Sequence, residues 1–292
     1  MQAFIKSGLL FIKFDPILDG TGMTERCNIL ITGGTSGLGL ELVKLFLSKG
    51  YFVVTTGRRI IEMTGSGGRF KSYQVDFADL YQTAEVFKEI CKISDFDYVV
   101  YNAGILSPPE FIQTKNGYEY TYQVNFLAHL LANEIIIQNH DPVRPLRIAA
   151  VISMAYRVAA PEFKPAGSPS GYKAWKAYSD SKLYLALMCL HYSAKFADRQ
   201  IQLFSFDPGI FGSKLYRTQS GIFRMIYQVG VRILRKPVKP AVALSEILTG
   251  SDLNNGAVYD VRKRIRRIPE PELSYSETFW DNAMEELTQI LK

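Results

Sequence analysis

The chain has 292 residues, of which 47% are hydrophobic and 21% are charged, and its formal net charge is +6. This composition excludes a disordered chain, and the length suits one large domain or two ordinary ones. The positive charge is compatible with nucleic acid or an anionic membrane surface as a partner. However, the basic residues are not interleaved with any recognised nucleic-acid module, so we expect no nucleic-acid binding.

Residues 1–22 open the chain with an apolar stretch that Lys6 and Lys13 interrupt. The stretch is shorter than the ~20 residues of a membrane-spanning helix, and it lacks the cleavage pattern of a signal peptide. Because a compact domain can begin at Met23, we interpret residues 1–22 as an extension that arises from an upstream start codon. An amphipathic segment at a membrane interface is the alternative.

From residue 27 onward, short apolar runs alternate with polar turns and helical stretches. The apolar runs predict strands over residues 27–34, 51–57, 71–77, 96–104, 146–154, 201–209 and 256–261. Helical periodicity predicts helices over residues 39–50, 79–93, 116–139 and 177–197. Continuous apolar strands that alternate with helices indicate parallel strands covered on both faces, which is a doubly wound α/β sheet.

No stretch of the chain indicates a boundary between two domains. Residues 157–173 are rich in Pro, Gly and Ser, and they are typical of a loop between a strand and a helix. We therefore expect a single domain over residues 23–292.

The cysteines and histidines show no pattern that binds a metal. Three cysteines lie far apart without a C-x-x-C motif, and three histidines have no ligand spacing: Cys27, Cys91, Cys189, His129, His140 and His191. We expect neither a disulfide framework nor a metal site. Free thiols suit a reducing compartment, so we expect a cytoplasmic protein, with peripheral attachment to a membrane as an option.

A glycine-rich turn follows the first predicted strand. Gly33, Gly37 and Gly39 are spaced as T-G-x-x-x-G-x-G, with Gly34 in addition, and a helix is expected to start near residues 36–38. Bare backbone at a helix N-terminus lets a dinucleotide pyrophosphate approach the free N–H groups. A merely tight strand-to-helix turn is the alternative for this motif taken alone.

Further motifs appear in a fixed order along the chain. They are Asp76 in VDF, Asn102 to Gly104 in NAG, Asn125 in QVNFLAH, Ser153, Tyr178 and Lys182 in YSDSK, and Asp207 to Ser213 in DPGIFGS. Together with the glycine motif, this series resembles the short-chain dehydrogenase/reductase family from Cys27 to the C-terminus. The resemblance implies a Rossmann-type fold and an oxidoreductase that uses a nicotinamide dinucleotide.

The end of the second strand bears on the choice of dinucleotide. Arg58 and Arg59 follow Gly57 there, and no acidic residue is present. An arginine suits the 2′-phosphate of NADP, whereas an acidic residue would suit the ribose of NAD. We therefore expect NADP(H) rather than NAD(H).

The resemblance extends the expected cofactor site along the chain. Asp76 is implied to contact the adenine amino group, although a turn or N-cap role would suit it equally. The full set of expected cofactor-binding residues is Thr32, Gly33, Thr35, Ser36, Gly37, Leu38, Gly39, Arg58, Arg59, Asp76, Phe77, Asn102, Ala103, Gly104, Tyr178, Lys182, Pro208, Gly209 and Ser213.

Tyr178 and Lys182 are expected to form an acid/base pair. Residues four apart lie on one face of a helix, and a neighbouring ammonium favours the phenolate form of a tyrosine. The resemblance implies that Lys182 also holds the nicotinamide ribose and that Ser153 hydrogen-bonds the substrate oxygen. It further implies that Asn125 holds a water linked to Lys182, whereas a helix asparagine that satisfies a neighbouring carbonyl is the plainer interpretation.

Residues 214–240 lie where the family has its variable substrate lid. This stretch is apolar and basic, which suits an apolar lining or contact with phospholipid, but a helix packed on the core with a solvated basic face would have the same pattern. A second basic run covers residues 262–267.

The C-terminal part of the chain resembles the retinol-dehydrogenase-like branch, which includes protochlorophyllide-reductase-like members. We therefore expect interconversion of an alcohol with a ketone or aldehyde, and a small lipophilic substrate. Peripheral membrane contact and a homodimer are options that the sequence leaves open. The alternative function is a catalytically silent NADP(H)-binding regulator or scaffold.

Overall fold

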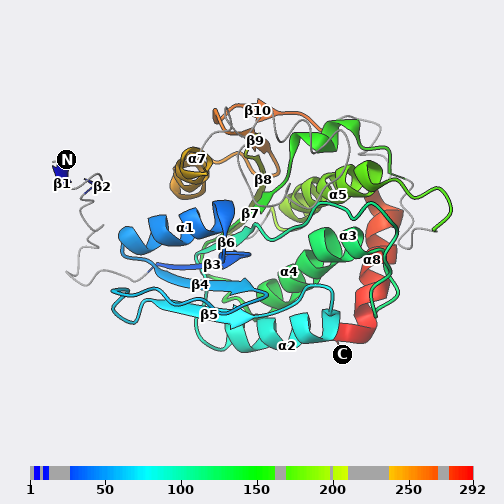
Figure 1. Ribbon diagram of the computed structural model, residues 1–292, viewed down its shortest axis with the longest axis horizontal. Coiled ribbons are helices and arrows are strands. Elements are labelled where there is room, and N and C mark those ends of the chain that lie inside the picture. The colour runs from blue at the N-terminus through cyan, green and yellow to red at the C-terminus, as the bar shows by residue number, and fades with distance from the viewer. Residues whose placement is uncertain are drawn as a thin grey trace.

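A mostly parallel sheet of eight strands forms the centre of the molecule. The computed structural model describes residues 3–6, 9–12, 27–161, 169–197, 200–209, 237–268 and 276–291. Within that part, the strand order is β10-β9-β8-β7-β6-β3-β4-β5 (Figure 1). The strands are β3 (Asn28–Thr32), β4 (Phe52–Gly57), β5 (Phe70–Gln74), β6 (Tyr98–Tyr101), β7 (Leu146–Val151), β8 (Ile201–Asp207), β9 (Val258–Asp260) and β10 (Ile265–Arg266).

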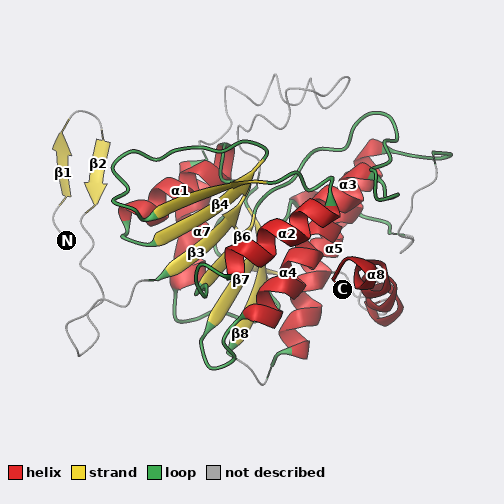
Figure 2. Ribbon diagram, turned by 90° about the horizontal axis from the view of Figure 1, so that it is seen from below, coloured by secondary structure: helices red, strands yellow, loops and turns green. Residues whose placement is uncertain are grey.

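Helices cover both faces of this sheet (Figure 2). On one face lie α1 (Gly37–Ser48) and α7 (Val238–Thr249), and on the other lie α2 (Leu80–Cys91), α4 (Ala128–Asn139) and α5 (Ala174–Lys195). Side chains alternate along β3, so Ile29 and Ile31 face the first layer and Leu30 the second. The expected doubly wound α/β fold with a single domain is therefore confirmed.

The direction of winding reverses beside β3. Its parallel neighbours are β4, the next strand in the chain, and β6 on the other side. In an open α/β sheet, ligands bind beyond the carboxyl ends of the strands at such a switch point. The glycine motif directly follows β3 and therefore lies at this point.

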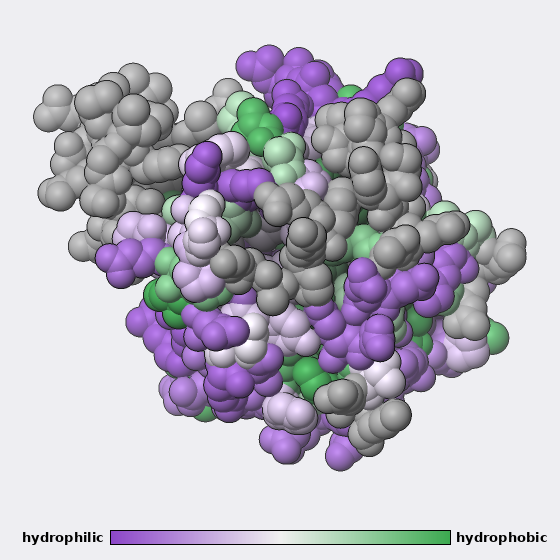
Figure 3. Space-filling view, turned by 90° about the vertical axis from the view of Figure 1, so that its right-hand side faces the viewer, coloured by the Kyte–Doolittle hydropathy of each residue, from purple (hydrophilic) through white to green (hydrophobic). Residues whose placement is uncertain are grey.

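A further helix, α8 (Ser276–Leu291), lies outside the layer of α4 and α5. It buries Phe279, Trp280, Ala283, Leu287 and Ile290, which recur every three or four residues as in an amphipathic helix. Helices α2 and α8 both pack against α4, and ten consecutive residues of α4, Ala128–Ile137, are buried, including the polar residues His129, Asn133 and Glu134. The face of the molecule shown in Figure 3 is mostly hydrophilic, with small separate hydrophobic areas.

Some elements differ from the sequence expectation. The helix expected over residues 116–139 begins at Tyr120 (α3, Tyr120–Tyr122), because Gly117 lies in a turn with φ +92° and Glu119 caps the helix by accepting the N–H of Tyr122 at 2.7 Å. A π-turn (Gln123–Leu127) then joins α3 to α4. The short strand β10 pairs antiparallel with β9, which the sequence pattern did not predict.

The N-terminal segment contains two short strands, β1 (Ala3–Lys6) and β2 (Leu9–Ile12), which pair antiparallel with each other. No helix among the described residues has the length and apolar character needed to cross a bilayer.

Candidate active site

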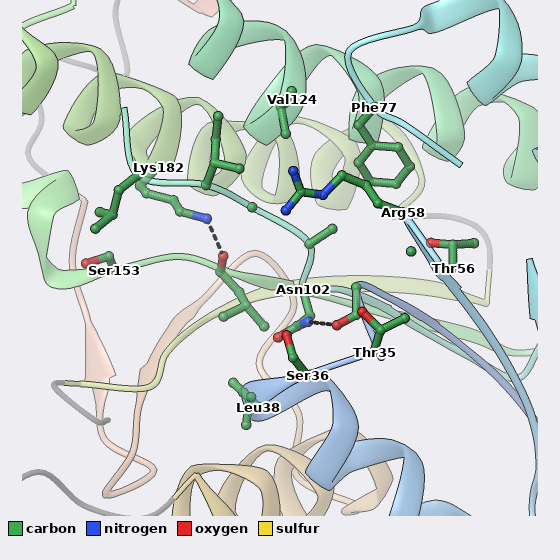
Figure 4. A pocket seen from close by; sticks show the side chains of 18 of the residues that line it. Thr35, Ser36, Leu38, Thr56, Arg58, Phe77, Asn102, Val124, Ser153 and Lys182 are labelled. Atoms are coloured by element: carbon green, nitrogen blue, oxygen red, sulfur yellow. Dashed lines mark hydrogen bonds between the residues drawn. The ribbon is translucent and has the colours of Figure 1, made fainter. Parts of the chain in front are cut away.

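A cavity of about 490 Å³ opens at the carboxyl ends of β3, β4, β6, β7 and β8 (Figure 4). It brings together most of the site residues expected from the sequence. Those that line it are Gly33, Thr35, Ser36, Gly37, Leu38, Arg58, Asp76, Phe77, Asn102, Ala103, Gly104, Ser153, Tyr178, Lys182, Pro208 and Gly209. Thr32, Gly39, Arg59 and Asn125 lie next to these residues without lining the cavity, and Ser213 lies outside the described residues.

The glycine-rich turn leaves open space at the start of α1. Gly37 has a φ of +57°, and a Cβ placed on it would meet no protein atom within 4 Å. Ser36 is the N-cap residue, yet its side chain makes no capping hydrogen bond. The first N–H groups of α1 and the positive end of its dipole are thus positioned beside the cavity, where they suit an anionic group such as a pyrophosphate.

Gly39 has a different reason for lacking a side chain. A Cβ on Gly39 would lie 2.4 Å from the carbonyl oxygen of Gly33 and 2.5 Å from Nδ2 of Asn102. This glycine therefore allows α1 to pack closely on the end of β3, which supports the cavity from behind.

Thr32 and Asn102 join the ends of β3 and β6 below the cavity. Oγ1 of Thr32 accepts the backbone N–H groups of Asn102 at 2.9 Å and Ala103 at 3.0 Å. Nδ2 of Asn102 donates to the carbonyl oxygen of Thr32 at 2.9 Å and to that of Gly33 at 3.2 Å, and the contact to Gly33 is drawn in Figure 4. The two strand ends are therefore held in one hydrogen-bonded unit.

The two arginines after β4 lie differently. Arg58 lines the cavity, and its side chain extends into it on the side of Phe77 (Figure 4). Arg59 does not line the cavity and donates from Nη2 to the carbonyl oxygen of Thr35 at 3.4 Å, although both arginines are exposed to solvent. Of the two, Arg58 is the one placed to contact a bound phosphate.

Asp76 lies at the edge of the cavity and also has a role in a turn. It lines the cavity, and its Oδ1 also accepts the N–H of Ala78 at 3.0 Å, as in a turn. Its backbone N–H donates to Oε1 of Gln82 at 2.9 Å. The turn therefore fixes the carboxylate at the cavity edge.

The expected acid/base pair lies at the other end of the cavity, on α5. Nζ of Lys182 lies 6.0 Å from the centre of the Tyr178 ring and donates to the carbonyl oxygen of Val151 at 3.1 Å (Figure 4). The lysine side chain is buried, and desolvation lowers its pKa from 10.5 to about 8. The ammonium form therefore still predominates at neutral pH.

Ser153 follows β7 at the same end of the cavity. Its Oγ accepts the N–H of Ala155 at 3.3 Å, at the start of a 3-10 helix (Met154–Val158). A hydroxyl that accepts in this way can still donate its hydrogen to a bound oxygen atom.

Asn125 lies in the π-turn and contacts the wall of the cavity from behind. Its Oδ1 accepts the N–H of Ile105 at 2.7 Å, and its Nδ2 donates to the carbonyl oxygen of Ile105 and to Oγ of Ser181, each at 3.0 Å. A Cβ on Gly104 would lie 3.2 Å from both Oδ1 of Asn125 and Nζ of Lys182. Among the described residues, the asparagine side chain thus clamps the segment that follows Gly104.

Sequence reasoning missed several lining residues between these motifs. They are Thr56, Gly57, Val75, Ile105, Leu106, Tyr120, Val124, Val151 and Ile152. Most of them are direct chain neighbours of motif residues at strand ends, and Tyr120 and Val124 are one turn apart. The missed residues at strand ends could have been predicted from their position, because the carboxyl ends of parallel strands line the ligand site.

Known proteins resemble this chain in sequence and in fold. A model of the short chain dehydrogenase family matches residues 27–220, which is more than half of the chain. An uncharacterized oxidoreductase of Schizosaccharomyces pombe is 34% identical over 161 residues, 49% of this chain and 45% of that protein. Human retinol dehydrogenase 12 is 24% identical over 203 residues, 66% of this chain and 64% of that protein. The matched region spans between 45% and 64% of the length of such curated relatives.

Solved structures share the fold. ElxO with NADP bound has a TM-score of 0.62 at 20% identity, covering 81% of this chain and 97% of that one. The 3-oxoacyl-(acyl-carrier protein) reductase from Brucella melitensis in complex with NAD has a TM-score of 0.64 at 20% identity, covering 81% and 96%. The chain belongs to the short-chain dehydrogenase family, in the branch that contains retinol dehydrogenases.

Proposed function

We propose that this protein is an NADP(H)-dependent oxidoreductase that interconverts an alcohol with a ketone or aldehyde. One observation carries the proposal: a single cavity has Arg58 and an uncapped helix N-terminus toward one end and Ser153, Tyr178 and Lys182 toward the other. Such a cavity can hold a phosphate-bearing dinucleotide and a reacting carbon at the same time.

The side chains of the site supply the proton transfer. A bound nicotinamide exchanges the hydride with the substrate carbon. The Tyr178 hydroxyl gives a proton to the substrate oxygen in reduction and takes it back in oxidation. The Lys182 ammonium stabilises the phenolate form of Tyr178, and the Ser153 hydroxyl donates to the substrate oxygen as charge develops there.

Arg58 supports the choice of NADP(H). Its guanidinium is a planar, permanently charged donor that suits a phosphate, and it lines the cavity while Arg59 does not. The fold alone does not select the dinucleotide, because ElxO binds NADP and the Brucella reductase of the same fold binds NAD.

A lipophilic substrate suits the apolar part of the lining. Ile105, Leu106 and Ile152 contribute apolar side chains to the cavity, and retinol dehydrogenases are among the curated relatives. The expected lid, residues 214–240, lies largely outside the described residues, and its end, Val238–Pro240, forms the first turn of α7. Contact of the lid with a membrane surface is part of this proposal.

We assign the oxidoreductase domain to residues 23–292 and treat residues 1–22 as a separate segment. The two described strands of that segment pair with each other, whereas the strands from β3 to β10 form a sheet of their own.

A turnover screen tests the proposed function. The purified protein is mixed with NADPH or NADH and a series of aldehydes and ketones of increasing chain length, with and without liposomes. We expect NADPH consumption that is faster with longer, more apolar substrates and slower with NADH. Tight NADPH binding without consumption in any mixture would instead support the catalytically silent alternative.

A further inference from the structure

His129 is fully buried directly behind the cavity, on α4, one helical turn after Asn125. Its Nδ1 lies 3.0 Å from the carbonyl oxygen of Asn125, and its Nε2 lies 3.1 Å from Oγ1 of Thr32. The ring is packed between Phe77 at 5.0 Å and Tyr101 at 5.3 Å, measured between ring centres. Hydrogen bonds to both ring nitrogens and contacts with two aromatic rings therefore fix the position of the imidazole.

These contacts determine which ring nitrogen carries the hydrogen. The carbonyl oxygen of Asn125 can only accept, so Nδ1 of His129 must donate. Burial lowers the pKa of His129 to about 3, which keeps the ring neutral at physiological pH. A neutral imidazole carries a hydrogen on only one of its two nitrogens, so Nε2 is unprotonated and accepts a hydrogen bond.

The hydrogen-bonding capacity of Thr32 leads to the same arrangement. Its hydroxyl accepts from the N–H groups of both Asn102 and Ala103, which uses both lone pairs. The hydroxyl hydrogen must then point elsewhere, and the acceptors within reach are Nε2 of His129 at 3.1 Å and the carbonyl oxygen of Val100 at 3.4 Å. The shorter contact is to the bare nitrogen.

We infer that His129 is a positioning residue for the dinucleotide site. By accepting the Thr32 hydrogen, it turns the hydroxyl lone pairs toward Asn102 and Ala103 and so fixes residues 102–104 at the floor of the cavity. That the ligand is a dinucleotide rests on the proposed function, whereas the hydrogen bonds of His129 and Thr32 do not depend on it.

The orientation of the Thr32 hydroxyl affects the shape of the cavity, because the residues that it holds are closely packed. A Cβ on Gly33 would lie 2.8 Å from Cα of Ala103, so residues 102–104 already lie against the glycine-rich turn. Asn125 holds the following residue, Ile105, through its side chain and holds His129 through its carbonyl oxygen. Residues 102–105 line the cavity, and both ends of this segment are therefore held by side chains from one helical turn: His129, through Thr32, at the start and Asn125 at the end.

Substitutions at His129 separate this role from simple packing. His129→Phe keeps an aromatic ring between Phe77 and Tyr101 but removes both hydrogen bonds. His129→Gln can restore an acceptor for Thr32. We expect His129→Phe to weaken NADPH binding about tenfold, His129→Gln to recover most of that loss, and kcat at saturating cofactor to change much less than KM.

Two further variants complete the binding experiment, which measures the dissociation constant of NADPH directly. The matched control is His140→Gln, since His140 is also buried and contacts the carbonyl oxygen of Arg144, but it does not line the cavity. In the Thr32→Val background, His129→Phe should cause no further loss, because the two residues act through one contact. Unchanged binding in His129→Phe, or losses that add, would overturn the inference.

A measurement on the unliganded parent keeps the inference testable if a variant fails to fold. Nitrogen-15 NMR of labelled histidine side chains reports which nitrogen carries the hydrogen. We expect the Nδ1–H form for His129, with no titration from about pH 5 to about pH 8. A hydrogen on Nε2, or titration in that range, would contradict the inference. A parent that binds neither NADPH nor NADH would count against the proposed function alone.

Discussion

Lys182 combines a buried position with a charge that the proposed chemistry needs. Its pKa is lowered from 10.5 to about 8 because burial removes the ammonium from water. At pH values below about 8 the lysine is charged in both the folded and the unfolded chain, so folding bears the full desolvation cost. Between about pH 8 and 10.5 the unfolded chain binds more protons, and this cost disappears as the pH rises.

We therefore expect Lys182→Met to be more stable than the parent at pH 7 while losing turnover. The pKa shift corresponds to about 3 kcal/mol, from which the lost hydrogen bond to Val151 subtracts about 1 kcal/mol. Urea unfolding at about pH 7 and about pH 10 should show a gain that shrinks at the higher pH. Lys44→Met, at an exposed position on α1, serves as the control. A Lys182→Met protein that is less stable than the parent at pH 7 would argue against this account.

Arg58 and Arg59 offer a matched pair for testing cofactor preference. Arg58→Ala should reduce the ratio of kcat/KM for NADPH over NADH by about tenfold or more, because a charge-assisted contact to the 2′-phosphate is lost. Arg59→Ala should leave the ratio within about twofold, since the Arg59 side chain does not line the cavity and donates to the backbone carbonyl oxygen of Thr35. Equal effects of the two substitutions would refute the special role of Arg58.

The sequence predicted many cavity residues because they occur in recognisable motifs at strand ends. Gly39, Thr32 and Asn125 were expected at the site, but their contacts with the cavity walls depend on distances that no spacing reveals. His129 gave no signal as a lone histidine in an apolar helix. Its partner Thr32 is 97 residues away in the chain, and the contact exists only once α4 packs on the sheet.

At the level of elements, the predicted strands and long helices follow from continuous apolar runs and helical periodicity. The exceptions have local causes. Turn formation at Gly117 delays the start of α3, and helical periodicity does not distinguish the π-helical turn at Gln123–Leu127 from an α-helix. The strand β10 consists of only Ile265 and Arg266, so it lacks the continuous apolar run of the other strands.

Helix α8 supports the layer that carries the site, although it lies outside the stretch matched by the family model. The Phe279 ring stacks on Tyr184 at 4.6 Å and on Phe126 at 5.5 Å, between ring centres. Phe279→Ala should lower the free energy of unfolding by about 3 kcal/mol, since a buried aromatic ring is lost. Thr288→Ala, on the exposed face of the same helix, is the control for urea unfolding. A change below about 1 kcal/mol for Phe279→Ala would show that α8 is not needed for stability.

For the whole molecule, the order of the strands determines where the site forms. Strands β3 and β6 are neighbours although two strands and two helices separate them in the chain, and this brings the glycine motif beside Asn102. Alternating strands and helices predicted the doubly wound sheet. That Arg58 and Tyr178, which are far apart in the chain, line one cavity required the packed structure.

The most direct test of the central claim compares Tyr178→Phe with Tyr184→Phe. Both residues lie on α5, but Tyr184 stacks on Phe279 and does not line the cavity. With a substrate that the parent reduces, we expect Tyr178→Phe to lose turnover by about a hundredfold or more while it binds NADPH as the parent does. Tyr184→Phe should keep turnover. If Tyr178→Phe retained the turnover of the parent, the assignment of this cavity as an acid/base redox site would be wrong.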